Sequence, residues 1–124
     1  ADLTVCEGLP EGAYSEIISL AALKRAHAEG EDRHRSEYST LYLFEHPEKF
    51  HLLRVQAPPS LHRPDIRLTV DYPEDLIVCR AIVEALGQGD CYFGLEEIIA
   101  YMDAHPAVKA MNGWIDSGQG RIWA

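Results

Sequence analysis

The sequence is poor in cysteine, and its histidines do not follow a metal-binding spacing. Both features reduce the range of functions that the chain could have. Its cysteines are Cys6, Cys79 and Cys91, an odd number with no Cys-x-x-Cys pair. This argues against a disulfide framework, favours a reducing compartment and predicts a cytoplasmic protein. The six histidines show no His-x-x-x-His spacing, so no transition-metal site is expected.

Basic residues and long apolar runs are also scarce. Lys and Arg number 11 against 20 Asp and Glu, a net charge of −9. Such a chain repels nucleic acid on average, so no nucleic-acid partner is expected, although a local basic pocket for a small anion remains possible. No apolar stretch approaches the ~20 residues that span a bilayer, so no membrane partner is expected. The first residue is Ala1 rather than Met, which suggests a processed start or a fragment of a longer chain.

The pattern that is present alternates strands with helices. Residues 1–14 are expected to form a short strand followed by a Gly/Pro loop, and further strands are expected in "SEIISL", "FHLLRVQAP" and "DIRLTV". The last of these has strict period-2 alternation, with Ile66, Leu68 and Val70 on one side. Three or four strands are few for a complete doubly wound sheet, so the pattern predicts an α/β layer structure with an incomplete sheet and an open edge.

Helix signals fall between and after these strands. Ser19 and Gly30 bound one expected helix, and Ser36 is expected to cap another that Pro47 ends. Pro73 starts the best-signalled helix, whose expected apolar stripe is Leu76, Cys79, Ile82, Val83 and Leu86, with Gly87 as its stop. Further helical segments are "LEEIIAYMDAH" and "PAVKAMN", and residues 113–124 form a Gly- and Trp-containing tail expected to be irregular or an edge strand.

Asp71 lies where the alternating stretch meets the helix that begins at Pro73. Sites in open α/β sheets gather at the carboxyl ends of strands, and a carboxylate there can bind a hard cation such as Mg²⁺. The alternative is that Asp71 caps the helix by accepting a backbone N–H bond.

Three further residues are candidates for binding a substrate. Glu16 lies in an expected strand, where a solvated position is the alternative. Glu37 falls in the expected first turn of a helix, where compensation of the helix dipole would explain it equally. Arg67, with Arg63, could bind phosphate or carboxylate, or could pair with a neighbouring acid such as Asp65. No catalytic nucleophile or triad can be assigned.

Several stretches resemble the sugar cytidylyltransferases, in particular the spore coat polysaccharide biosynthesis subgroup related to acylneuraminate and Kdo cytidylyltransferases. "RLTVDYPEDL" followed by "VCRAIVEALG" is similar to the late family motif "RLTVDTPEDL" and its helix, with Tyr72 in place of Thr. The stretches "GLPEGAYSEIISLAALKRA", "RSEYSTLYLFEHPEKF" and "FGLEEIIAYMDAHPAVKAMN" also match in the family's order. The resemblance covers most of residues 1–112.

The resemblance implies a partial nucleotidyltransferase-like three-layer sandwich, with an incomplete mixed sheet flanked by helices. It implies transfer of CMP from CTP to a sugar acid, with Mg²⁺ as cofactor in the complete enzyme. The family's metal-holding Asp carries over to Asp71, and its sugar-side Glu to Glu16. Glu37 matches the Glu of the family's "REH", although Tyr38 stands in place of the His.

The matched region is only the C-terminal part of the family's domain. Its nucleotide-binding half, with a Gly-rich basic phosphate loop and an earlier metal Asp, has no counterpart here. The chain alone is therefore expected to be inactive, with the missing half supplied in the same polypeptide or by a separate chain. The alternative is a non-catalytic sugar-binding or interaction module on the same scaffold. The open sheet edge predicts a homodimer.

Overall fold

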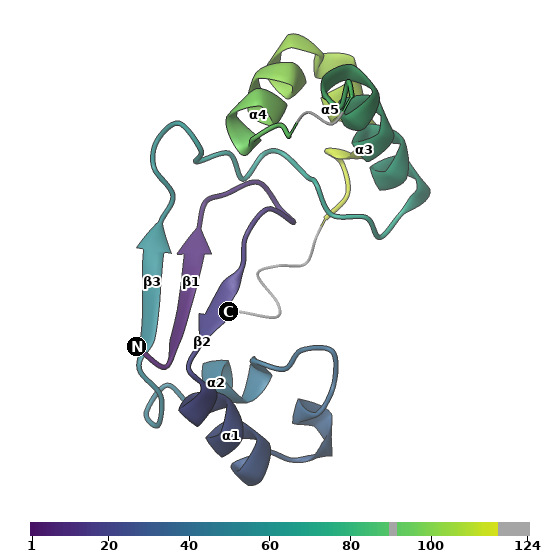
Figure 1. Ribbon diagram of the computed structural model, residues 1–124. Coiled ribbons are helices and arrows are strands. Elements are labelled where there is room, and N and C mark those ends of the chain that lie inside the picture. The colour runs from purple at the N-terminus through teal and green to yellow at the C-terminus, as the bar shows by residue number, and fades with distance from the viewer. Residues whose placement is uncertain (90–91, 117–124) are drawn as a thin grey trace. The chain divides into compact units, whose positions relative to one another are not determined.

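A computed structural model describes residues 1–89 and 92–116, which fold into two compact units (Figure 1). Within the described residues, the first unit comprises Ala1–Cys6 and Ser15–Val55, and the second comprises Glu7–Tyr14 and Gln56–Asp116. The chain therefore crosses from one unit to the other after Cys6, Tyr14 and Val55. Each unit has its own apolar core.

The first unit is built on a mixed sheet of three strands in the order β2-β1-β3. These are β1 (Leu3–Glu7), β2 (Glu16–Ile18) and β3 (Leu52–Gln56), so three of the expected strands are confirmed. β1 and β2 are antiparallel, with Leu3 opposite Ile18, whereas β1 and β3 run in the same direction (Figure 1). The α/β fold class with an incomplete mixed sheet flanked by helices is thereby confirmed.

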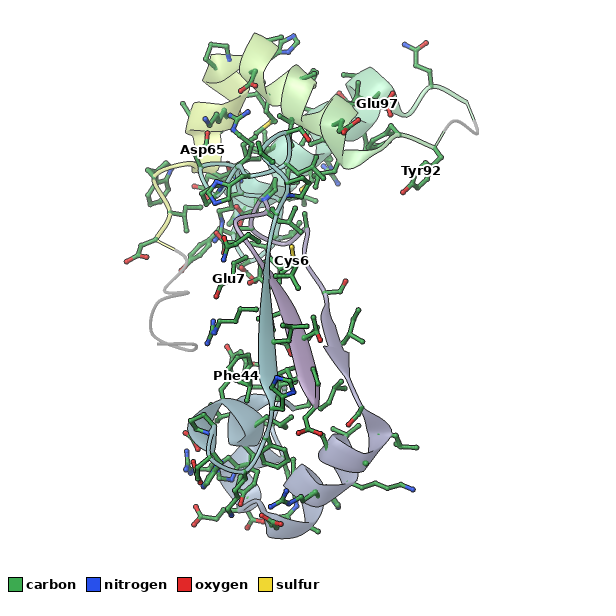
Figure 2. The ribbon with its side chains drawn as sticks, turned by 90° about the vertical axis from the view of Figure 1, so that its left-hand side faces the viewer. Cys6, Glu7, Phe44, Asp65, Tyr92 and Glu97 are labelled. Atoms are coloured by element: carbon green, nitrogen blue, oxygen red, sulfur yellow. The ribbon has the colours of Figure 1, made fainter. Side chains whose placement is uncertain are left out.

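Helix α1 (Leu20–Glu29) follows β2 and has the expected ends. The Ala22 N–H donates to Ser19 Oγ at 3.1 Å, and the Gly30 N–H donates to the Ala26 carbonyl. The unit's core combines this helix with the strands and the next helix: Leu3, Ala22, Ala26, Tyr42, Leu43 and Phe50. In Figure 2, Phe44 lies beside the strands, and it packs against that core.

The helix expected after Ser36 is shorter than predicted. Ser36 does not cap it, because its Oγ accepts the Tyr38 N–H at 3.2 Å and forms a local turn instead. A short 3-10 helix covers Asp32–His34, and α2 begins only at Leu41 (Leu41–Glu45). Glu37 therefore lies in an exposed bend before the helix, and its expected place in a first helical turn is wrong.

An ion-pair cluster fixes this turn. The Arg33 guanidinium donates to both oxygens of Glu45, at 2.7 and 2.8 Å. The buried His34 accepts the Glu31 N–H at Nδ1, so its proton is on Nε2, which lies 2.8 Å from Glu45. Hydrogen bonds from Arg33 and His34 lower the pKa of Glu45 to about 2.

The second unit contains the segment predicted to be the "DIRLTV" strand. That prediction is wrong: among the described residues the segment makes one isolated parallel bridge, between Arg67 and Glu11. The Glu11 N–H donates to the Ile66 carbonyl at 2.9 Å, and the Leu68 N–H to the Glu11 carbonyl at 2.7 Å. The ladder does not continue on either side, because the Ile66 N–H donates to the Arg63 carbonyl and the Ala13 N–H donates to the Pro10 carbonyl, while Gly12 turns the chain at φ 87°.

Three helices complete the second unit, each close to its predicted span: α3 (Pro73–Leu86), α4 (Leu95–Ala104) and α5 (Pro106–Asn112), with Gly113 following α5. The core is formed by Ile66, Val78, Ile82, Ile99 and Met102. The predicted stripe on α3 is partly wrong, because Leu76 and Val83 are exposed while Asp75 is buried. Relative to the predicted stripe, the buried face is rotated toward Asp75, Val78 and Ile82.

Tyr92 and Glu97 mark the beginning of α4. Tyr92 is 95% exposed and points away from the helices, and Glu97 lies in the first turn (Figure 2). The Gly94 N–H donates to Glu97 at 2.7 Å.

No helix within the described ranges is long and apolar enough to cross a membrane. Cys91 and tail residues 117–124 lie outside those ranges.

Candidate functional site

The junction at Asp71 is capped by a residue other than Asp71. Tyr72 is the N-cap of α3, and Pro73 occupies the first helical position. The backbone N–H groups of Asp71 and Tyr72 both donate to Asp75 Oδ2, at 3.0 Å each. An acidic side chain at the third helical position that reaches back to the N-cap is half of a capping box. The capping role considered for the Asp71 side chain therefore belongs to Asp75.

Asp75 also anchors Arg67. Arg67 donates from Nε to Asp75 Oδ1 at 2.8 Å and from Nη2 to Asp75 Oδ2 at 3.0 Å, with side-chain exposures of 5% and 0%. This is a bidentate, charge-assisted pair. Hydrogen bonding from Arg67 holds the pKa of Asp75 well below its ordinary value, and Asp75 raises the pKa of Arg67.

Arg67 has two more acidic partners. Its Nη1 donates to Glu11 Oε1 at 2.7 Å, and its Nη2 also donates to Asp71 Oδ2 at 2.9 Å. Glu11 reaches Arg67 because Gly12 lets the loop approach closely: a Cβ on Gly12 would lie 2.6 Å from the backbone nitrogen of Thr69. Arg63 instead forms the ion pair with Asp65 that was one of the sequence alternatives.

Asn112, at the end of α5, connects that helix to the same network. Its Nδ2 donates to Asp75 Oδ1 at 2.9 Å and to the Arg67 carbonyl at 3.1 Å. Both neighbours are acceptors, so the amide nitrogen must face them, and Oδ1 points away without a hydrogen-bond partner in the buried interior. Asn112 is 1% exposed.

Asp71 is the member of the network that opens to solvent, with 61% of its side chain exposed. Its Oδ2 contacts Arg67 and, at 3.4 Å, Thr69 Oγ1, and no contact to Oδ1 is found among the described residues. Carboxylate oxygen suits Mg²⁺, which commonly uses one or two protein carboxylates together with waters and substrate phosphates. Asp71 therefore fits as one ligand. The described ranges contain no cluster of three acidic, His or Cys side chains that could hold a metal ion by themselves.

The four residues singled out in the sequence fall into two groups. Arg67 and Asp71 are in direct contact in the second unit. Glu16 and Glu37 belong to the first unit, where Glu16 is half-buried on β2 opposite Val5 and Glu37 is exposed. The roles predicted for these residues toward substrate and metal stay predictions.

Sequence reasoning missed three members of the network: Glu11, Asp75 and Asn112. The signal for Asp75 was present, because an acid two residues after a helix-starting Pro matches the third position of a capping box. Glu11 and Asn112 lie far from Arg67 in the sequence, and only the tertiary fold brings them to it.

The fold defined by these units is an α/β, nucleotidyltransferase-like fold. The chain is similar to the solved structure of a cytidylyltransferase from Leptospira borgpetersenii, with a TM-score of 0.67 over 86% of this chain and 44% of that one, at 18% identity. This likeness confirms the expected fold.

Two curated proteins are similar in sequence. One is the spore coat polysaccharide biosynthesis protein SpsF of Bacillus subtilis, 30% identical over 91 residues, which are 71% of this chain and 37% of SpsF. The other is an uncharacterized protein of Methanocaldococcus jannaschii, 28% identical over 102 residues, which are 82% of this chain and 41% of that protein. The chain thus spans about two fifths of the length of these relatives. No protein-family model matches it.

Proposed function

We propose that this chain is the C-terminal portion of a nucleotidyltransferase that transfers CMP from CTP to a sugar acid for surface polysaccharide biosynthesis. The observation that carries the proposal is the fold likeness to a cytidylyltransferase, and the sequence similarity to SpsF supports it. Because the chain matches only about two fifths of its relatives, we propose that it is inactive alone.

In this proposal Asp71 supplies one carboxylate ligand to Mg²⁺ in the complete enzyme. Its exposed side chain at the start of α3, with one oxygen engaged by Arg67, supports that role. Bound Mg²⁺ would neutralise charge on the triphosphate and orient it. The remaining ligands would come from the triphosphate, from water and from the nucleotide-binding half.

Glu16 and Glu37 are proposed to contact the sugar acid, and the resemblance of their stretches to the family supports this. Carboxylates can accept hydrogen bonds from sugar hydroxyls. Arg67 was predicted to bind substrate directly. Its guanidinium is 5% exposed and bound to three carboxylates, which supports an indirect contribution through Asp71.

A homodimer in the cytoplasm is also proposed. Ile17 on β2 is 71% exposed, and Leu53 and Val55 on β3 are 44% and 45% exposed, so both outer strands carry apolar side chains open to solvent. Edge strands of this kind are commonly covered by another chain. Light scattering at rising concentration should give the mass of a dimer, and a monomer at every concentration would contradict this part.

Pyrophosphate release from CTP, with sugar acids as acceptors and Mg²⁺ present, tests the main proposal. The 124-residue chain should release none, whereas a polypeptide that includes the upstream coding sequence should release it. Asp71→Asn in that longer protein should abolish release, since the amide keeps the size but loses the charge. Tight CTP binding by the 124-residue chain would refute the proposal. Sugar-acid binding without CTP turnover in either protein would favour the non-catalytic module.

A further inference from the structure

The guanidinium of Arg67 is held by two hydrogen bonds to Asp75 in addition to the one that it donates to Asp71. Nε and Nη2 both donate to Asp75, at 2.8 and 3.0 Å, and the guanidinium is a rigid planar fork. Two bonds to one carboxylate define the plane and the rotation of the fork. The direction of the remaining Nη2 bond, 2.9 Å to Asp71 Oδ2, is then set by geometry rather than by a flexible side chain.

Asp75, the anchor of the fork, is itself held by three groups other than Arg67. The backbone N–H groups of Asp71 and Tyr72 donate to its Oδ2, and Asn112 Nδ2 donates to its Oδ1. Asn112 also holds the backbone carbonyl of Arg67 at 3.1 Å. The anchor is therefore tied to the start of α3 and to the end of α5, two elements that pack together in the second unit.

The network around Arg67 contains more carboxylates than cations, and its most exposed carboxylate is that of Asp71. One guanidinium meets the three carboxylates of Glu11, Asp71 and Asp75. The side chains of Asp75 and Glu11 are 0% and 17% exposed, against 61% for Asp71. With one guanidinium and three carboxylates, the network has a formal surplus of two negative charges, and Asp71 is its most exposed carboxylate.

We propose that Arg67 is a positioning residue that holds the Asp71 carboxylate in one orientation, and that Asp75 and Asn112 fix Arg67 for this purpose. Its consequence for metal binding rests on the function proposed above, whereas the orientation itself does not. Partners that orient a metal ligand commonly change metal affinity by about 10- to 100-fold when mutated. A lysine cannot replace this arginine, because one ammonium cannot form the bidentate pair and also reach Asp71.

The orientation can be measured without metal or nucleotide. Three-bond NMR couplings report whether the χ1 angle of Asp71 in the 124-residue chain occupies one rotamer or averages over several. The wild type should show a single rotamer, and Arg67→Lys should show averaging. Glu11→Ala is the matched control: it removes a partner from Nη1 of the same guanidinium but leaves the bonds to Asp75 and Asp71, so the single rotamer should persist.

The wild-type measurement alone can overturn the proposal, because averaging of Asp71 in the intact chain would mean that nothing positions it. Asn112→Ser tests the support of the anchor separately, since it removes one of the three groups that hold Asp75 while retaining the arginine. A folded Arg67→Lys in which Asp71 keeps one rotamer would leave Arg67 with a purely structural role, and the same result in Asn112→Ser would remove Asn112 from the positioning network.

A Mg²⁺ titration of the complete protein separates this inference from the proposed function. In Arg67→Lys the Mg²⁺ concentration for half-maximal pyrophosphate release should rise roughly 10-fold or more, with activity largely recovered at saturating Mg²⁺. Lower activity with an unchanged Mg²⁺ dependence would overturn the positioning role. If the wild type turns over no CTP, the proposed function fails while the rotamer result still decides the orientation.

Discussion

Removing the Asp75 carboxylate should destabilise the second unit far more than removing an ordinary helix cap. Asp75→Ala leaves the buried guanidinium of Arg67 without its bidentate partner, and breaking a buried ion pair from one side costs about 3–5 kcal/mol. The variant also frees two backbone N–H groups at the start of α3. A total near 4 kcal/mol is a large fraction of the ~5–15 kcal/mol that stabilises a typical domain.

Glu97→Ala provides the matched control. Glu97 occupies the same helical position in α4 and accepts the N-cap N–H of Gly94, but it is exposed and pairs with no buried cation within the described parts of the chain. Its loss should cost about 1 kcal/mol, the usual effect of a cap. The difference between the two variants therefore reports the contacts that Asp75 makes and Glu97 lacks, chiefly those with the buried Arg67 and Asn112.

Native-state hydrogen exchange followed by NMR resolves the two helices separately. At 1.4 kcal/mol per factor of ten, protection of α3 amides should fall roughly 1,000-fold in Asp75→Ala, and protection of α4 amides about fivefold in Glu97→Ala. Equal losses would refute the reasoning. Replacing the pair together, as Arg67→Met with Asp75→Leu, should recover part of the loss, because the buried guanidinium is removed and only the more exposed carboxylates of Glu11 and Asp71 lose their partner.

Three other predictions concern the rest of the chain. Ile82→Ala, in the core, should cost about 2–4 kcal/mol in urea unfolding, against less than about 1 kcal/mol for the exposed Leu76→Ala; equal costs would contradict the rotated face of α3. Gly12→Ala should cost more than about 2 kcal/mol because its Cβ would meet backbone, whereas Gly89→Ala, also at positive φ but in open space, should cost about 1 kcal/mol. The pKa of Glu45 in the folded protein is about 2, below its ordinary 4.5. The contribution of this carboxylate to folding stability is therefore complete above about pH 5 and is lost as the pH falls toward 2. In an acid titration of unfolding free energy, Glu45→Gln should flatten that part of the profile.

Local signals in the sequence were sufficient for most elements. Ser19 and Gly30 bound α1 as expected, and the Pro73 signal placed the start of α3. The helix start predicted at Ser36 was wrong, because a serine side chain can accept a hydrogen bond from the backbone N–H two residues on as readily as it can cap a helix. Helix length there is set by burial of Tyr42 and Leu43, which the local pattern does not reveal.

The exposed position of Asp71 at the start of α3 was predictable from the sequence, whereas the contacts around it were not. Asp71 lies at the junction where the sequence put it, with an exposed carboxylate. The alternation around Arg67 suggested a strand, yet among the described residues the segment pairs at one bridge only. Arg67 turns inward to meet Asp75, which is near in sequence, and Glu11, which is distant. Periodicity reports which residues share a side, and it carries no information about a buried ion pair that draws a charged side chain into the core.

The interleaving of the two units limits how this chain can be divided. Because the second unit uses Glu7–Tyr14 as well as Gln56–Asp116, a protein truncated to begin at Gln56 would lack Glu11 and the loop that carries it. Truncation from the N-terminus therefore cannot yield an intact second unit on its own, and a protease cut at one crossing leaves the two units linked through the other crossings.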